Sequence, residues 1–406
     1  MAKRVIGIIG AGPAGIFAAL EAKKSGAEVL LFDSNDRIGR KLLVTGSGRC
    51  NLTNAGVKAD KYACGDPEFV GQALAQFGHL HLLKYLDELG ILTYATSDGW
   101  FYPISNSAAN VVDTLEMALL QAGIILHLGK SVSEFHQKGN RFRIIREDQP
   151  APIEVDRLIV ASGGKAYPTL GSTGHLLPIL SQLGHIILPV EPALGPVLTD
   201  PKPFHKIQGV RLDAGLTLFE GQHRLGQTIG NIIFTQWGLN GPGIMDLSHL
   251  VSLRPGKKLH LEIDFIAASE DSLLRWLKTN RQRSYPLRIV LGAVMPAKVP
   301  PLLLELANLP VELRLDQITD PQLDRFLKFI RSIPLDVQGT RGFEYCQLST
   351  GGVNTYEVDP LNMESRLVKN LYLAGETLDV IGPCGGYNLQ WAFSSGVIAG
   401  RAAGRE

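Results

Sequence analysis

The sequence predicts an α/β fold in which both ends of the chain build one domain and the middle of the chain is inserted into it. Three observations predict this. A glycine-rich turn follows a wholly apolar run near residue 5; short β-prone runs between Gly- and Pro-containing turns begin at about residue 191; helical periodicity takes over from about residue 269. At 406 residues the chain exceeds what one core usually supports, so we expect two or three domains.

The N-terminal elements follow from local patterns. Residues 5–9 are all apolar or glycine, as a central parallel strand covered on both faces requires. A helix is expected over about 13–25, where Gly26 ends it, and a second parallel strand over 28–32, just before Asp33. Together they form a βαβ unit.

Further elements of the same domain follow along the chain. Leucine spacing predicts one helical stretch over about 67–89, and valine and leucine spacing predicts a helix over about 108–121. Strands are expected at 124–128, 141–147 and 156–161.

The middle of the chain changes character twice. Residues 191–266 read as an antiparallel β subdomain and residues 267–335 as a helical one, with a helix start at Asp320. Residues 336–406 return through the β subdomain and, with residues 1–190, complete the first domain.

Bulk composition excludes several classes of protein. Apolar residues make up 45% and charged residues 19%, as in ordinary globular proteins. The net charge of +1 and the lack of a basic run argue against a polyanionic partner, although a local patch remains possible. The four cysteines lack metal-site spacing and suit reduced thiols in a cytoplasmic protein; neither a metal site nor a membrane span is expected.

The motif from Gly10 to Gly15 is G-x-G-x-x-G between a predicted strand and a predicted helix. Gly10 permits a tight turn, Gly12 lets backbone approach a pyrophosphate, and Gly15 lets the helix pack closely on the strand. The helix N-terminus offers free N–H groups and partial positive charge to phosphates, and Asp33 stands where a carboxylate accepts hydrogen bonds from ribose hydroxyls. The pattern predicts a Rossmann-type nucleotide site.

Other motifs accompany this turn along the whole chain. They are Gly39-Arg40-Lys41, Ser47-Gly48-Arg49-Cys50-Asn51-Leu52-Thr53-Asn54, Ala161-Ser162-Gly163-Gly164, Phe234-Thr235, Gly238, Gly241-Pro242, Thr350-Gly351-Gly352-Val353, Gly375-Glu376 and Gly385-Gly386-Tyr387-Asn388. In this order they resemble the YhiN/BaiN-like family of FAD-dependent oxidoreductases, within the glutathione-reductase-like flavoprotein superfamily. The resemblance implies a Rossmann-type FAD-binding domain made from both chain ends, with a β-barrel-like and a small helical insertion.

The resemblance also implies which residues contact FAD. The pyrophosphate would lie on Gly12–Gly15, the segment 40–51 would run along the cofactor towards the flavin, and Glu376 would contact the ribityl or pyrophosphate region. The expected cofactor-binding residues are Gly10, Ala11, Gly12, Pro13, Ala14, Gly15, Asp33, Ser34, Arg40, Lys41, Gly48, Arg49, Cys50, Asn51, Val132, Ala161, Ser162, Gly163, Gly375, Glu376, Gly386, Tyr387, Asn388 and Leu389.

A helix from about residue 387 to 403 follows Gly385-Gly386. Its N-terminus would point at the pyrimidine edge of the flavin, where a positive helix end stabilises the negative charge of reduced flavin. Tyr387, Asn388 and Gln390 would line the site or simply cap and pack this helix.

The catalytic candidates are Cys384, Tyr387 and Arg49. Cys384 precedes the helix, where a thiol's pKa could fall and the thiol could protonate a substrate; the alternative is a small buried thiol. The guanidinium of Arg49 suits a phosphate or a substrate carboxylate, unless it is a surface salt-bridge residue. Cys50 is expected to pack rather than act in redox chemistry, and His175 is a weak proton-donor candidate beside a structural alternative.

No second G-x-G-x-x-G follows a predicted strand, so either NAD(P)H docks transiently at the flavin or the electrons come from another reductant. The resemblance implies a reductase passing hydride from NAD(P)H through flavin N5 to the activated C=C bond of a small conjugated carbonyl substrate, such as an enone-type steroid acid. The alternatives are reduction of uracil to dihydrouridine in ribosomal RNA, an RNA-binding module with structural FAD, or an enzyme running in the oxidising direction. A local basic patch keeps rRNA as an alternative partner; its residues are Arg37, Arg40, Lys41 and Arg49. The sequence predicts neither which nicotinamide is used nor the oligomeric state.

Overall fold

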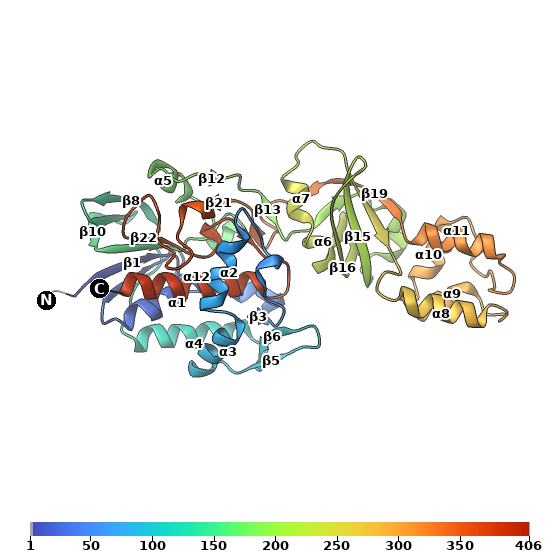
Figure 1. Cartoon of the computed structure of the whole chain (residues 1–406), viewed down its shortest axis with the longest axis horizontal. Coiled ribbons are helices and arrows are strands. Elements are labelled where there is room, and N and C mark those ends of the chain that lie inside the picture. Colours follow the sequence, from blue (N-terminus) through green and yellow to red (C-terminus); the bar gives the residue numbers. More distant parts are fainter. Residues whose placement is uncertain (1–2, 406) are drawn as a thin grey trace. The chain divides into compact units, whose positions relative to one another are not determined.

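The computed structural model describes residues 3–405. They divide into two compact units: the first contains both ends of the chain, up to Glu191 and again from Leu348, and the second is Pro192–Gln347. Each unit has its own hydrophobic core. The predicted fold class is confirmed, because a parallel Rossmann-like sheet is joined by a barrel and helices in the intervening chain (Figure 1).

The first unit is organised by a five-stranded parallel sheet of order β22-β11-β1-β2-β7. These strands are β1 (Val5–Ile9), β2 (Glu28–Phe32), β7 (Ile125–His127), β11 (Arg157–Val160) and β22 (Leu371–Leu373). β22 comes from the C-terminal part of the chain and pairs with β11 at one edge. The expected strands at 28–32, 124–128 and 156–161 are therefore members of one sheet.

Two three-stranded sheets and several helices belong to the same unit as this sheet. The small sheets contain β3 (Thr53–Asn54), β5 (Thr93–Ala95) and β6 (Trp100–Pro103), and β8 (Val132–Lys138), β9 (Arg141–Arg146) and β10 (Gln149–Val155). The helices are α1 (Pro13–Lys23), α2 (Pro67–Gln76), α3 (His79–Glu88), α4 (Ala108–Gln121), α5 (Leu177–Gln182) and α12 (Tyr387–Gly404). The helix expected at 108–121 matches α4.

The single helical stretch expected over 67–89 is wrong, because the chain forms two helices there. Phe77 leaves the helical conformation with φ −148° and Gly78 is the N-cap of α3. The carbonyl of Phe77 accepts hydrogen bonds from Ser394 Oγ (2.7 Å) and Gln390 Nε2 (3.2 Å) of α12. These distant donors satisfy the carbonyl at the break, which leucine spacing alone could not indicate.

Helices α1 and α12 pack with their backbones in close contact. A Cβ at Gly396 would lie 2.2 Å from the carbonyl oxygen of Ala14, and one at Gly400 would lie 2.3 Å from that of Ala18. Residue numbers rise together along both helices, so the helices are parallel. Only glycine permits this approach.

Glu21 of α1 carries the ionic contact between these two helices. Its carboxylate is almost fully buried and lies 2.5 Å from Lys24 Nζ and 2.7 Å from Arg401 Nε of α12. Burial raises its pKa, but the two cations outweigh burial and hold the pKa below its usual value. A depressed pKa in the folded state means that this group contributes stability above its unfolded pKa and loses that contribution as the pH falls.

We therefore expect Glu21→Gln to lower the free energy of unfolding at pH 7 by about 1–3 kcal/mol, since Arg401 and Lys24 lose a buried partner. The difference from wild type should shrink as the pH falls below the usual carboxylate range, where wild-type Glu21 is itself protonated. Urea unfolding at pH 7 and at low pH measures this. An equal loss at both pH values would mean that packing, not charge, accounts for the effect.

The second unit contains a closed barrel of order β14-β17-β16-β15-β18-β19. Its strands are β14 (Val197–Thr199), β15 (Arg211–Glu220), β16 (His223–Thr235), β17 (Gly238–Asn240), β18 (Leu259–Asp264) and β19 (Ile333–Thr340). The short helices α6 (Pro242–Met245) and α7 (Ser248–Ser252) lie between β17 and β18 in the chain. β19 follows the helical segment in sequence, so the helices are an insertion within the barrel.

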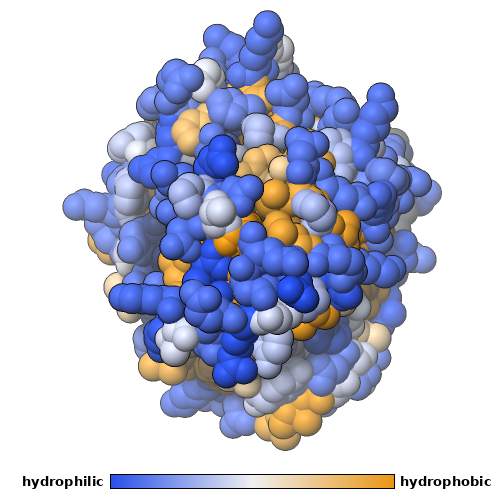
Figure 2. Space-filling view, turned by 90° about the vertical axis from the view of Figure 1, so that its right-hand side faces the viewer, coloured by the Kyte–Doolittle hydropathy of each residue, from blue (hydrophilic) through white to orange (hydrophobic). Residues whose placement is uncertain are grey.

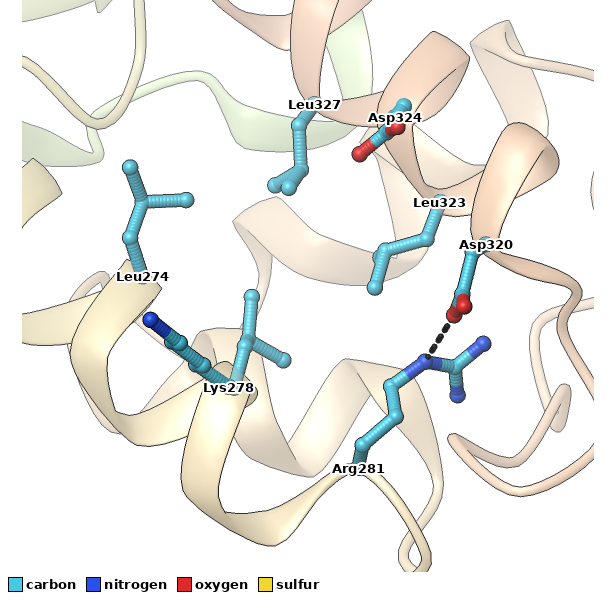
Figure 3. Close-up of a pocket in the computed structure, with 8 residues that line it drawn as sticks. Leu274, Lys278, Arg281, Asp320, Leu323, Asp324 and Leu327 are labelled. Carbon is cyan, nitrogen blue, oxygen red and sulfur yellow. Dashed lines mark hydrogen bonds and ion pairs between the residues drawn. The ribbon is translucent and has the colours of Figure 1, made fainter.

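That helical segment contains α8 (Glu270–Asn280), α9 (Leu287–Gly292), α10 (Val299–Leu306) and α11 (Asp320–Ile330). Thr319 and Gln322 form a capping box that starts α11 near the expected position. Leu274, Leu323 and Leu327 line a shallow groove between α8 and α11, where Arg281 pairs with Asp320 at 2.8 Å (Figure 3). Figure 2 shows apolar surface among hydrophilic side chains at this helical end.

Candidate functional site

The glycine turn has the geometry that its spacing predicts. Gly10 has φ +105°, and a Cβ there would lie 2.3 Å from the carbonyl oxygen of Ala161; a Cβ at Gly15 would lie 1.7 Å from that of Gly10. Gly12 differs, because its Cβ would meet no described atom within 4 Å. Gly12 is the N-cap of α1, and no side chain among residues 3–405 caps it. Open space in front of an uncapped helix start fits a pyrophosphate.

Asp33 directly follows β2 and braces this turn. Its Oδ2 accepts a hydrogen bond from the backbone N–H of Ala11 (2.7 Å), and its Oδ1 accepts two from Asn35 (both 2.9 Å). A carboxylate has about four lone-pair positions, so one remains for a ribose hydroxyl. Ser34 lies beside Gly171, whose Cβ would be 3.2 Å from Ser34 Oγ.

Ala161, Ser162 and Gly163 follow β11 at the same end of the sheet as the glycine turn. The N–H of Ala161 donates to Ile9 (2.8 Å), and Gly163 has φ +77°. Val132 lies at the start of β8, and its carbonyl faces His175 Nε2 at 3.0 Å. His175 also contacts Thr173 Oγ1 at 2.8 Å, which supports its structural role.

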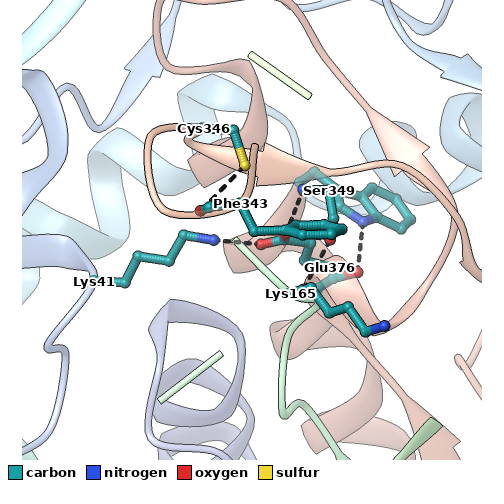
Figure 4. Close-up of polar contacts among 8 residues, drawn as sticks. Lys41, Lys165, Phe343, Cys346, Ser349 and Glu376 are labelled. Atoms are coloured by element: carbon teal, nitrogen blue, oxygen red, sulfur yellow. Dashed lines mark hydrogen bonds and ion pairs between the residues drawn. The ribbon is translucent and has the colours of Figure 1, made fainter. Parts of the chain in front are cut away.

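Glu376 joins three parts of the first unit. Its Oε2 accepts a hydrogen bond from Lys41 Nζ (2.7 Å), while its Oε1 accepts from the N–H and the Oγ of Ser349 (2.8 and 3.0 Å; Figure 4). The preceding Gly375 donates its N–H to Ser395 Oγ (2.9 Å). Both carboxylate oxygens thus have partners within the protein, and Ser349, which the sequence did not single out, fixes the orientation of the Glu376 carboxylate.

The segment from Arg40 to Asn51 is a strained loop. Ser47 and Cys50 have positive φ (57° and 63°) without being glycine, and Gly48 has φ +83°. Exposed Arg49 forms no ion pair within the described chain and instead stacks on Tyr102 at 4.6 Å. Its Nε also donates to the carbonyl of Gly46 (3.4 Å) and its Nη2 to Tyr102 Oη (3.5 Å), and the remaining N–H groups of this stacked guanidinium suit an anion.

The N-terminus of α12 likewise lacks a side-chain cap within residues 3–405, and a helix start without such a cap is called open below. Gly386 is its N-cap with φ +95°, and no side chain among the described residues caps it. A Cβ at Gly386 would lie 2.5 Å from the carbonyl oxygen of Thr53. Asn54 Nδ2 donates to the carbonyl of Gly385 (3.0 Å), so the 51–54 segment holds this helix start in place.

The three polar residues at the start of α12 have different surroundings. Tyr387 is largely buried, and its carbonyl accepts a hydrogen bond from Tyr62 Oη (2.9 Å). Asn388 binds the backbone N–H and carbonyl of Gly382 (2.7 and 2.8 Å). Gln390 is completely buried and accepts a hydrogen bond from Thr53 Oγ1 (2.6 Å). Gln390 therefore packs the helix rather than lining an open site.

The two open helix starts have a defined offset. Ala14 lies against Gly396 and Ala18 against Gly400. α1 begins one residue before Ala14 and α12 begins nine residues before Gly396, so the starts differ by eight residues, or about 12 Å at 1.5 Å per residue. The two positive helix ends therefore face the same way, one set back from the other.

The cysteines of the described chain form no disulfide, and burial keeps two of their thiols protonated. None of the four cysteines forms a disulfide within residues 3–405. Burial raises the pKa of Cys50 to about 12 and that of Cys64 to about 11, so both remain neutral thiols. Cys384 is partly exposed, two residues before the N-cap of α12. Cys50 thus packs, as expected.

His185, Glu357 and Ser365 reproduce the order of a catalytic Ser–His–acid relay. His185 Nδ1 lies 3.1 Å from Glu357 Oε2, and its Nε2 lies 3.0 Å from Ser365 Oγ. Ser365 Oγ, however, is buried and accepts N–H groups from Leu367 (3.1 Å) and Val368 (2.9 Å). Its lone pairs are occupied, so this set is structural and not a nucleophile.

Within the described residues, no group of three or more His, Cys, Asp or Glu side chains could hold a metal ion. Of the helices found between residues 3 and 405, none has the length and apolar character needed to cross a bilayer.

The parallel sheet, the glycine turn and the two open helix starts define a Rossmann-type dinucleotide-binding protein. The chain belongs to the HI0933-like protein Rossmann domain family, whose model matches residues 4–402. This confirms the predicted YhiN/BaiN-like family, which is a family of flavoprotein oxidoreductases, and the chain is an oxidoreductase.

Two relatives align over nearly their whole length. A 3-dehydro-bile acid delta(4,6)-reductase of Clostridium scindens is 37% identical over 405 residues, covering 98% of each chain. A ribosomal RNA dihydrouridine synthase of Haemophilus influenzae is 30% identical over 412 residues, also covering 98% of each. Among solved structures, an open flavocytochrome c3 fumarate reductase has a TM-score of 0.47 at 16% identity, with 99% of this chain and 78% of that chain covered.

Proposed function

We propose that this chain binds FAD and reduces a carbon–carbon double bond conjugated with a carbonyl group, with NAD(P)H as the electron donor. The observation that carries the proposal is the pair of uncapped, parallel helix starts, offset by about 12 Å. A Cβ at Gly10 before one start, or at Gly386 before the other, would strike backbone. A dinucleotide needs one positive site for its pyrophosphate, and a flavin benefits from a second at its pyrimidine edge.

The residues at these positions fit FAD. Gly12–Gly15 would hold the pyrophosphate and Asp33 the ribose, while the first turn of α12 would face the flavin. Lys41 and Ser349 fix the carboxylate of Glu376 beside Gly375. Glu376 would therefore support the FAD site mainly by holding these two residues in place. When bound, FAD supplies the two-electron carrier of the reaction.

The chain's own contribution is electrostatic. Each helix start favours negative charge by typically about 0.3–1 kcal/mol, and by up to about 2 kcal/mol where it is partly buried. Cys384 and Tyr387 flank the start of α12 and are our candidates for donating a proton to substrate. Arg49, stacked on Tyr102, is the candidate for holding an anion beside the cofactor.

The substrate class is proposed from the 37% identical relative, whose name describes reduction of a steroid enone. Uracil in RNA is also a double bond next to a carbonyl, and the relative at 30% identity acts on it by name. The basic patch that would bind RNA phosphates is partly neutralised, because Arg37 pairs with Asp113 and Lys41 pairs with Glu376. We therefore favour a small conjugated carbonyl compound.

An anaerobic absorption spectrum of the purified protein tests the proposal. We expect a flavin spectrum that bleaches with NADH or NADPH and returns when a 3-oxo-4-ene steroid is added. A flavin that no nicotinamide bleaches would exclude the donor, and reduced flavin that the enone leaves unchanged would exclude the substrate class. Reoxidation by a uracil-containing rRNA fragment instead would favour the RNA alternative.

A further inference from the structure

Three aromatic rings share one face of the three-stranded sheet of β3, β5 and β6. Tyr94 of β5 pairs with Tyr102 of β6, and Trp100 lies two residues before Tyr102, so the three side chains project from the same face. The ring centroid of Tyr102 lies 6.1 Å from that of Tyr94 and 6.5 Å from that of Trp100. All three residues belong to the first unit, which also contains α12 and the glycine turn.

Trp100 brings the N–H edge of its indole ring to the start of α12. Asn54 pairs with Trp100 between β3 and β6, and Asn54 Nδ2 donates to the carbonyl of Gly385 (3.0 Å). A Cβ at Gly385 would lie 2.9 Å from Trp100 Cε2 and 3.0 Å from Trp100 Nε1. Gly385 directly precedes Gly386, the N-cap of α12, so the indole nitrogen lies beside this open helix start.

The indole N–H of Trp100 has no acceptor among residues 3–405, whereas that of Trp391 donates to the carbonyl of Gly375 (3.1 Å). The side chain of Trp100 is only partly buried. An indole nitrogen can donate but not accept, and it usually finds a partner when its ring is buried. A bound molecule that places an acceptor at the start of α12 would supply the missing partner.

We infer that Trp100 Nε1 donates a hydrogen bond to the pyrimidine edge of the flavin and, together with the start of α12, favours the reduced cofactor. The inference rests on the proposed function, which places the flavin at this helix start. Reduced flavin carries negative charge at its pyrimidine edge, and a hydrogen bond to a charged acceptor is roughly twice as strong as one to a neutral acceptor. Trp100 therefore stabilises reduced flavin more than oxidised flavin, which raises the reduction potential of the bound cofactor.

The reduction potential of the holoprotein tests this inference, measured against reference dyes at about pH 8.5, where imidazole is neutral. W100F removes the donor and keeps an aromatic ring. Its affinity for reduced flavin should fall about tenfold relative to that for oxidised flavin, which lowers the potential by about 30 mV for a two-electron couple. W100H keeps a ring N–H donor and should restore part of this loss.

W276F is the matched control for the loss of an indole. Trp276 is a partly buried tryptophan of the second unit, stacked on Tyr285 with ring centroids 6.3 Å apart. This variant should keep the wild-type potential.

The other results overturn the inference. A W100F holoprotein with the wild-type potential shows that the indole N–H does not reach the flavin. Equal falls in W100F and W100H assign the effect to packing against Gly385, and an equal fall in W276F shows that the effect is not local. Failure of the wild-type protein to bind flavin contradicts the proposed function itself, and the absorption spectrum shows this before any dye is added.

Discussion

A Gly15→Ala variant is expected to lose at least about nine-tenths of its bound flavin and to unfold more easily, by about 3 kcal/mol or more. The added methyl would lie 1.7 Å from the carbonyl oxygen of Gly10, so either the turn or α1 must move. Flavin content after gel filtration and the urea midpoint of the apoprotein measure the two effects.

Gly12→Ala is the matched comparison. Its methyl meets no described atom within 4 Å, and φ is an ordinary −80°, so the fold should be unaffected. The methyl would nevertheless project into the space in front of α1, where the pyrophosphate is proposed to lie. We expect wild-type apoprotein stability with flavin affinity lowered about tenfold or more. Wild-type affinity in Gly12→Ala would contradict this location of the phosphates.

Gly386→Ala is expected to show the second large effect. Its methyl would lie 2.5 Å from the carbonyl oxygen of Thr53, and φ +95° is unfavourable for alanine. Clash and strain together should lower the free energy of unfolding by about 2–4 kcal/mol and displace the start of α12. Flavin retention should fall, as measured by absorption after dialysis.

Gly90→Ala separates strain from clash. Gly90 follows α3 with φ +85°, and a Cβ there would meet no described atom within 4 Å. This variant should lose only about 1–2 kcal/mol, with flavin retention unchanged. If both variants lose the same stability and keep their flavin, the close approach of Gly386 to Thr53 does not support the cofactor site.

Local patterns in the sequence determined the βαβ unit, whereas the family resemblance rests on motifs along the whole chain. The apolar run at 5–9, the glycines at 10, 12 and 15 and the acid at 33 each depend on neighbours within about thirty residues, and strand, turn and helix propensities act over that range. In the middle of the chain, short β-prone runs give way to helical spacing of apolar residues, which indicated a β insertion followed by helices. The spacing of apolar residues within each element distinguishes a strand from a helix.

Only the tertiary structure decided how distant segments complete the site. The break at Phe77 depends on Ser394, the orientation of Glu376 depends on Lys41 and Ser349, and the offset of the two helix starts depends on Gly396 and Gly400 touching α1. Glycines at 396, 400 and 404 were a visible signal of close packing, but not of the partner. Most of these contacts join residues more than 300 apart in sequence, where local propensity carries no information and only the packing of the folded chain selects the partner.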